Sequence, residues 1–202
     1  LNRDSYTPFV HKVVVMIKIV NVVASGQIER EFDLAALQTD LNIYEKIYEP
    51  QRSPGLKLRF EKEGPVLILY KTGAYVIMRA KSKDDPERLY NALAEIVGEV
   101  DIDSLAAGNR PENRNLICKA NLGREVDLSA LGIGLGLQNI EYEPEQSPFL
   151  YYWPERENCL ISIPTNGKII ITGVELEDQA EQAFANLQNR IDELLQREQN
   201  GS

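Results

Sequence analysis

Asn21 and Asn115 are the residues whose type and spacing best suit the binding of a ligand, and they lie 94 residues apart. A carboxamide both donates and accepts hydrogen bonds, so it can contact the polar atoms of a ligand. Taken singly, each asparagine is equally well explained as a polar residue on a solvated sheet face. Their equal placement in two similar segments favours a pair of ligand contacts.

Residues suited to catalysis or to metal binding are scarce. The chain has one histidine, His11, and two cysteines, Cys118 and Cys159, without a CxxC spacing. No Ser-His-Asp, Cys-His or zinc-ligand set can be assembled from them, so we expect no enzyme and no cofactor. The two thiols are typical of small core residues in a reducing compartment. The glycines at 132, 134 and 136 follow an expected short helix instead of a strand, which argues against a phosphate-binding loop.

Composition predicts a folded chain without a membrane span. Hydrophobic residues make up 43% and charged residues 26% of the 202 positions, enough for a sizeable core. No apolar run approaches the roughly 20 residues that cross a bilayer, and no signal peptide is recognisable. The net charge of −9 disfavours a surface that grips nucleic acid everywhere, although it allows a local basic face.

An internal repeat determines the expected architecture. Five groups of residues return at a constant offset of 94 without a gap. They are Asn21-Val22-Val23, Arg30-Glu31 with Asp33-Leu34, Tyr48-Glu49-Pro50, Ser53-Pro54 and Gly73, which return as Asn115-Leu116-Ile117, Arg124-Glu125 with Asp127-Leu128, Tyr142-Glu143-Pro144, Ser147-Pro148 and Gly167. A period this long with two copies indicates two half-domains and not a solenoid.

Periodicity within the first copy predicts four strands and two helices. Strands are expected at 18–25, 56–60, 66–70 and 75–80, the last two joined by a turn at Gly73. A short helix runs from Leu34 to about Leu41 after Asp33, and a longer one begins near Ser82 or Asp84 with Pro86 in its first turn. The second copy repeats this order and ends in a helix over 177–196.

The expected fold is α+β: two half-domains related by a pseudo-two-fold axis form one curved antiparallel sheet with helices on the convex face. We predict an N-terminal segment at 1–15, repeats at 16–105 and 106–198, and a tail at 199–202. The helices cover one sheet face and leave the other open, and an open surface of that size indicates a binding partner.

In these motifs the chain resembles the TATA-box-binding protein family, whose halves have signatures like Q-N-I-V, Y-E-P-E-x-F-P-G and L-I-F-x-S-G-K-x-x-x-T-G-A-K. The counterparts here are 20–23, 48–55 and 67–81 in the first copy, and 114–117, 142–149 and 161–173 in the second. The resemblance covers roughly residues 16–195. It implies a general initiation factor that binds A·T-rich double-stranded promoter DNA in the minor groove, with a transcription factor B-like protein and RNA polymerase as partners.

The resemblance also implies which residues bind. The implied DNA contacts are Asn21, Val23, Arg59, Tyr70, Val76, Lys81, Asn115, Ile117, Lys168, Ile170 and Thr172. Asn21 and Asn115 would meet base edges, the apolar members would press on the groove floor, and Arg59, Lys81 and Lys168 would reach phosphates. Glu143 and Glu145 would meet the factor B-like protein. The acidic composition favours an archaeal-type cytoplasmic protein over a nuclear one.

Several positions depart from the family pattern. Its four intercalating phenylalanines fall at Ser53, Tyr70, Ser147 and Pro164, where Tyr70 alone has an aromatic ring. Phe149 and Phe60 are candidates for displaced wedges. Other departures are Met78, Arg79, Trp153 and Glu175, the last two at positions where the family has cations. Trp153 can stack on bases, bind protein or lie in the core.

Two interpretations follow from these observations. The first is a divergent TATA-box-binding protein with altered DNA bending. The second is a protein-interaction or regulatory module of the same fold that no longer binds the TATA box, which the missing wedges and the charge of −9 favour.

Overall fold

The computed structural model describes residues 17–97 and 110–200. Its elements in chain order are β1 (Lys18–Gln27), α1 (Leu34–Asp40), β2 (Glu45–Ile47), β3 (Gly55–Arg59), β4 (Val66–Tyr70), β5 (Ala74–Ala80), α2 (Asp85–Ile96), β6 (Glu112–Asn121), α3 (Leu128–Leu135), the 3-10 turn η2 (Leu137–Asn139), β7 (Ile140–Glu141), β8 (Phe149–Tyr152), β9 (Leu160–Pro164), β10 (Lys168–Val174) and α4 (Glu177–Asn200).

The strands form one ten-stranded antiparallel sheet in the order β2-β3-β4-β5-β1-β6-β10-β9-β8-β7. The two copies therefore join edge to edge through β1 and β6, where Val22 pairs with Leu116. These residues are 94 positions apart, so the pseudo-two-fold axis passes between them. The expected curved sheet of two repeated halves is confirmed.

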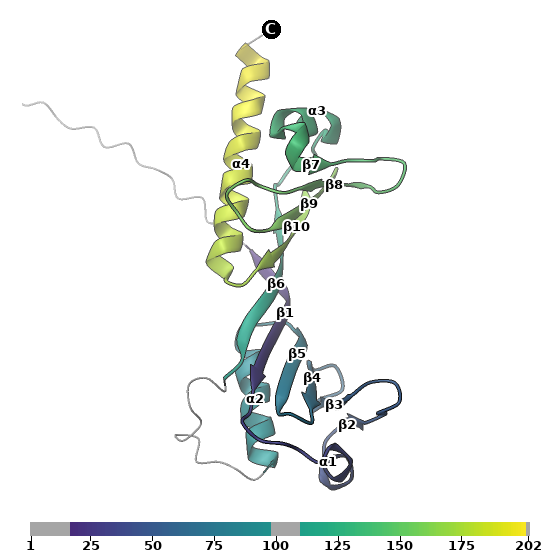
Figure 1. Cartoon of the computed structure of the whole chain (residues 1–202). Coiled ribbons are helices and arrows are strands. Elements are labelled where there is room, and N and C mark those ends of the chain that lie inside the picture. The colour runs from purple at the N-terminus through teal and green to yellow at the C-terminus, as the bar shows by residue number, and fades with distance from the viewer. Residues whose placement is uncertain (1–16, 98–109, 201–202) are drawn as a thin grey trace, which may run out of the picture.

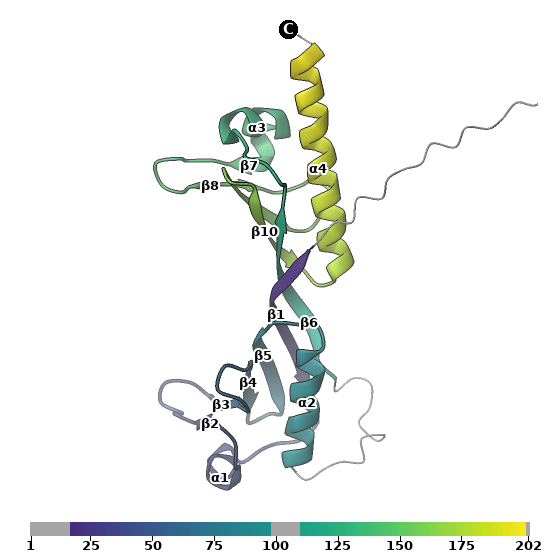
Figure 2. The same ribbon diagram turned by 180° about the vertical axis from the view of Figure 1, so that it is seen from behind.

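Helices α2 and α4 lie along one side of the sheet, while the β2–β3 and β7–β8 loops project from the other side (Figures 1 and 2). Strand residues on the helix side form the core, since Leu58, Ile77, Cys118 and Ile171 are completely buried. Residues between them in sequence face the opposite way. We call that uncovered surface the open face.

The predicted helices form with the expected caps. Asp33 accepts hydrogen bonds from the backbone N–H groups of Ala35 and Ala36 at the start of α1, and Asp127 does the same for α3. Asp84 is the N-cap of α2 without a side-chain bond, and Pro86 lies in the first turn. On α4, Ala180, Phe184, Leu187 and Ile191 are buried, as their spacing predicts.

Two details differ from expectation. Gly132 and Gly134 lie inside α3 and not after it. The side-chain ends of Ile140, Leu150 and Leu194 lie so close to these glycines that a larger residue there would have to displace them. Phe60 packs against the core cluster, so its prediction as a displaced wedge is wrong. In the described residues, no helix is long and apolar enough to cross a membrane.

Candidate nucleic-acid interface

The open face gathers the predicted contact residues from both halves. Asn21 and Val23 on β1 are paired with Ile117 and Asn115 on β6, so the two asparagines lie diagonally about the pseudo-two-fold axis. On either side, Ser25 pairs with Val76, and Thr172 pairs with Ile117. Cross-strand partners share a sheet face. The centre of the open face is therefore an apolar surface with two carboxamides in it.

The carboxamide of Asn115 has a defined orientation. The backbone N–H of Gly173 donates a 2.9 Å hydrogen bond to its Oδ1. Because the acceptor must be the oxygen, Nδ2 points away from Gly173, and it has no hydrogen-bond partner among the described residues. Asn115 therefore offers two N–H donors to a ligand on the open face.

A bulge on the last long strand of each half accompanies this arrangement. Gly173 has φ of 92° and marks a register shift in the β10 pairing with β6. Its counterpart Arg79 has φ of 62° at the equivalent shift between β5 and β1, a left-handed conformation unusual for a side chain of this size. Arg79 is exposed beside β1, and the equivalent residue of the second half is Gly173, which has no side chain.

The residues predicted to contact phosphates differ in their exposure and in whether a carboxylate is close to them. Arg59 is ion-paired with Glu45 at 3.5 Å, and its side chain is 18% exposed. Glu45 also binds Lys57 at 3.1 Å. Lys81 and Lys168 are exposed, and Lys168 shares the face of Ile170 because the two are two residues apart on β10. Charge neutralisation by Glu45 makes Arg59 the weakest phosphate ligand of the three.

Sequence reasoning missed two lysines on the open face. Lys119 pairs with Ile170 on one side and with Lys18 on the other, and both lysines are exposed. Like charges in a cross-strand pair repel unless an anion lies between them. The alternation from Asn115 through Ile117 to position 119 was the signal that pointed to Lys119.

Each end of the open face has one aromatic residue in equivalent cross-strand pairs. Tyr70 on β4 pairs with Gly55 on β3, and Phe149 on β8 pairs with Pro164 on β9. Gly55 and Phe149 are equivalent by the 94-residue offset, as are Tyr70 and Pro164. A Cβ on Gly55 would lie 3.2 Å from the Tyr70 ring. The ring has therefore changed strands between the halves while remaining in the same pair.

Glu143 and Glu145 lie on the β7–β8 loop, and both are exposed. This loop projects from the side of the sheet opposite α2 and α4 (Figure 1). Glu143 contacts Gln146 within the loop. The loop therefore presents carboxylates at the rim of the open face.

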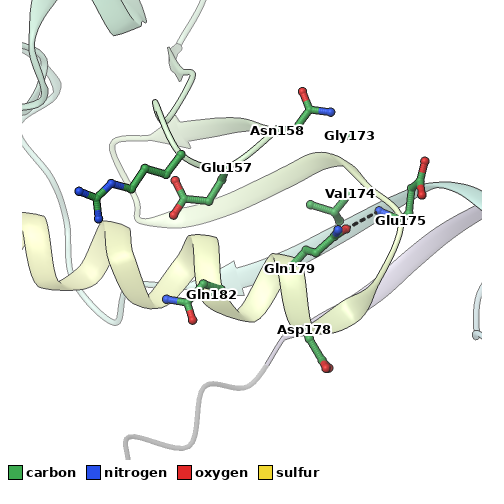
Figure 3. Close-up of a pocket in the computed structure, with 9 residues that line it drawn as sticks. Glu157, Asn158, Gly173, Val174, Glu175, Asp178, Gln179 and Gln182 are labelled. Atoms are coloured by element: carbon green, nitrogen blue, oxygen red, sulfur yellow. Dashed lines mark hydrogen bonds between the residues drawn. The ribbon is translucent and has the colours of Figure 1, made fainter.

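A hollow lies elsewhere, between the β8–β9 loop and the first turns of α4 (Figure 3). It measures about 610 Å³, and its charged lining residues are Glu157, Glu175, Asp178 and Arg156, so acidic residues predominate. Gln179 accepts hydrogen bonds from the N–H groups of Glu175 and Leu176. An acidic lining disfavours a phosphorylated ligand. Within the described part of the chain, no group of acidic, histidine and cysteine side chains is placed to hold a metal ion.

Comparison with known proteins agrees with this geometry. The family model described as transcription factor TFIID (or TATA-binding protein, TBP) matches residues 16–100 and again 110–194. The chain is 33% identical over 179 residues to TATA-box-binding protein C of Halobacterium salinarum, covering 89% of this chain and 99% of the relative. It is 38% identical over 180 residues to TATA-box-binding protein 2 of Haloferax volcanii, covering 88% and 94%.

A solved structure has the same fold. The TBP of Methanococcus jannaschii superposes with a TM-score of 0.72 at 30% sequence identity, covering 88% of this chain and 98% of that structure. The superposition covers 88% of this chain and so includes both halves, in agreement with the two separate family-model matches. The chain belongs to the family of transcription factor TFIID, or TATA-binding protein, a family of general transcription factors.

Proposed function

We propose that this chain is a general initiation factor that binds A·T-rich duplex DNA in the minor groove through its open face. The single observation behind this proposal is the orientation of Asn115. Its Oδ1 is occupied by Gly173, so it presents only N–H donors. The minor-groove edges of A·T pairs present only acceptors, whereas G·C pairs add a donor. A donor-only amide on an apolar surface matches A·T pairs.

The neighbouring residues support the same interface. Val23, Val76, Ile117 and Ile170 give the centre of the open face an apolar character suited to the floor of a minor groove. Lys81, Lys119 and Lys168 are exposed cations for phosphates around it. In this proposal Asn21, Thr172 and Tyr70 complete the contact surface, and Arg59 contributes little because Glu45 neutralises its charge.

We further propose that the bend in the DNA is altered. Ser53, Ser147 and Pro164 have no aromatic ring to insert between base pairs. The rings that remain, Tyr70 and Phe149, lie on different strands in the two halves. Energy transfer between dyes at the two duplex ends measures the bend, which we expect to be smaller than with a relative that has all four phenylalanines.

The partners in this proposal are a transcription factor B-like protein, through Glu143 and Glu145, and RNA polymerase. The proposed location is the cytoplasm of an archaeal-type cell, with the chromosome. Titration of A·T-rich and G·C-rich duplexes at about 50 mM salt, where phosphate contacts are strong, tests the proposal. Saturable binding that favours the A·T-rich duplex is expected, and the absence of duplex binding would contradict it.

A further inference from the structure

The outermost long strands of the two halves present different chemistry on the open face. Strand β3 directs Gly55, Lys57 and Arg59 to this face. The equivalent residues of the second half are Phe149, Tyr151 and Trp153, at the 94-residue offset. A cationic strand at one end of the sheet is therefore replaced by an aromatic one at the other. We call Phe149, Tyr151 and Trp153 the β8 aromatic stripe.

The residues of β8 that alternate with the aromatic stripe are packed into the core. Leu150 is completely buried and Tyr152 packs against the core, so Phe149 and Tyr151, which alternate with them on β8, face outward. Trp153 follows directly after the strand. The rings of Phe149 and Tyr151 lie 6.3 Å apart at 34°. The hydroxyls of Tyr151 and Ser147 are hydrogen-bonded at 3.1 Å. Trp153 is 44% exposed. The rings of Phe149 and Tyr151 therefore contact each other, and all three rings are at least partly accessible to a ligand.

The charge around the stripe is the opposite of what a phosphate backbone requires. Residues 139–157 contain five Asp/Glu and one Lys/Arg, whereas the equivalent residues 45–63 contain four and five. Glu141 pairs with Tyr151 across β7 and β8, so its carboxylate shares the face of that ring. Its counterpart Ile47 pairs with Lys57. At this pair of positions, the second half has a carboxylate and an aromatic ring where the first half has an isoleucine and a lysine.

Charge asymmetry extends over the whole second half. Residues 17–97 contain twelve Lys/Arg and twelve Asp/Glu, while residues 110–200 contain eight and fifteen. A cation over an aromatic ring gains from the ring quadrupole, and a nearby carboxylate adds to that attraction. Aromatic anchors beside carboxylates fit arginine or lysine side chains better than phosphates.

We propose that the β8 aromatic stripe, with Glu141, binds an Arg- or Lys-rich segment of a partner protein. The cationic side chains lie over Tyr151 and Trp153 and pair with Glu141. This surface is on the sheet itself and is separate from Glu143 and Glu145 on the neighbouring loop. Phe149 is shared with the proposed DNA bending, whereas Tyr151, Trp153 and Glu141 have no part in the proposed DNA contacts.

Trp153 is the only tryptophan of the chain, so its fluorescence reports directly on this surface. The experiment titrates the full chain, without DNA, with a short peptide of alternating Arg and Ser. A peptide of alternating Glu and Ser is the control. We expect a saturable change in Trp153 emission with the Arg peptide, weakened by salt, and none with the Glu peptide.

Substitutions locate the binding surface, measured by anisotropy of a dye-labelled Arg peptide. Tyr151→Lys restores the residue type of the first half and should weaken peptide binding by about 2- to 30-fold, the range of one cation–π contact. Glu141→Gln should weaken it and reduce its salt dependence. Tyr44→Lys, at an exposed tyrosine in the first half, should lower affinity far less. Circular dichroism confirms that each variant is folded.

Three results would overturn the proposal. One is an unchanged Trp153 emission at saturating Arg peptide, and another is equal binding of the Glu and Arg peptides. The third is tight binding of single-stranded oligo-dT that Tyr151→Lys weakens despite the added cation, which would make the stripe a base-stacking platform. Duplex titration of the same variants separates these results from a failure of the proposed DNA binding.

Discussion

The backbone N–H of Gly173 donates a 2.9 Å hydrogen bond to Oδ1 of Asn115, from the bulge of β10 to the centre of the open face. This contact fixes which end of the carboxamide is available to a ligand. The free end is a donor, and donors are what the acceptor-only minor-groove edge of an A·T pair requires. A backbone bulge therefore sets the polarity of a side chain on the neighbouring strand.

Replacing the Asn115 carboxamide tests that polarity. Asn115→Ala should weaken binding to an A·T-rich duplex by about 1–3 kcal/mol, the range for a base contact. Asn115→Asp retains an oxygen for the Gly173 N–H but has no donor, so we expect at least as large a loss. Fluorescence anisotropy with labelled duplex measures both. Asp binding as well as Asn would show that the donor is not used.

Salt dependence distinguishes free cations from neutralised ones. Lys119 is exposed and lies beside Lys18, whereas Arg59 is paired with Glu45. Lys119→Gln should reduce the slope of log K against log salt by about 0.9, the value for one phosphate contact. Arg59→Gln should change the slope much less. The reverse order in titrations from about 50 to 200 mM salt would assign the phosphate contact to Arg59.

Two glycines with positive φ give a stability prediction with a matched control. Gly73 has φ of 85°, and a Cβ there would lie 2.0 Å from the carbonyl oxygen of Ile28. Gly123 has φ of 75° with nothing within 4 Å. Gly123→Ala should cost about 1–2 kcal/mol for the left-handed backbone alone. Gly73→Ala should lower the free energy of unfolding, measured with urea, by more than Gly123→Ala does, because the backbone must also move.

The buried thiols predict a loss of stability at alkaline pH. Burial raises the pKa of Cys118 to about 11 from 9.0 and that of Cys159 to about 11. The folded state thus retains protons that the unfolded state releases between pH 9 and about 11. The contribution of the two neutral thiols to the free energy of unfolding is complete below pH 9 and is lost as the pH rises from 9 to about 11.

Urea unfolding at pH 8 and at pH 10.5 measures this change. The double variant Cys118→Ala and Cys159→Ala is the control, and it should lose less stability between the two pH values than the natural chain. An equal loss in both proteins would assign the alkaline effect to other groups, among them Tyr75, whose pKa burial also raises.

Much of the fold was predictable because the repeat is strict. The 94-residue repeat, in which Val22 corresponds to Leu116, predicts two halves with the same order of elements. The strand over Val66–Tyr70 follows from its apolar run. Strands β2 and β7 were not predicted as separate elements, since three residues and two residues are too short to show alternation. Only the antiparallel pairing with β3 and β8 defines them.

The candidate site was less predictable, because its geometry depends on contacts between strands. Asn115 was identified from the sequence, but its hydrogen bond to Gly173 spans 58 residues and has no local signal. The pairing of Arg59 with Glu45 likewise joins two strands. Lys119 was not predicted, because it lies outside the family motif at 114–117, although strand alternation from Asn115 indicates that it shares the same face.

The central claim is that the open face reads A·T pairs from the minor groove. Replacing every A·T pair of the bound duplex with I·C changes the major-groove edge but leaves a minor groove without the guanine amino donor. We expect nearly equal affinity for the A·T and I·C duplexes and clearly weaker binding to G·C. Loss of binding on the I·C duplex, with affinity as low as for G·C, would contradict it.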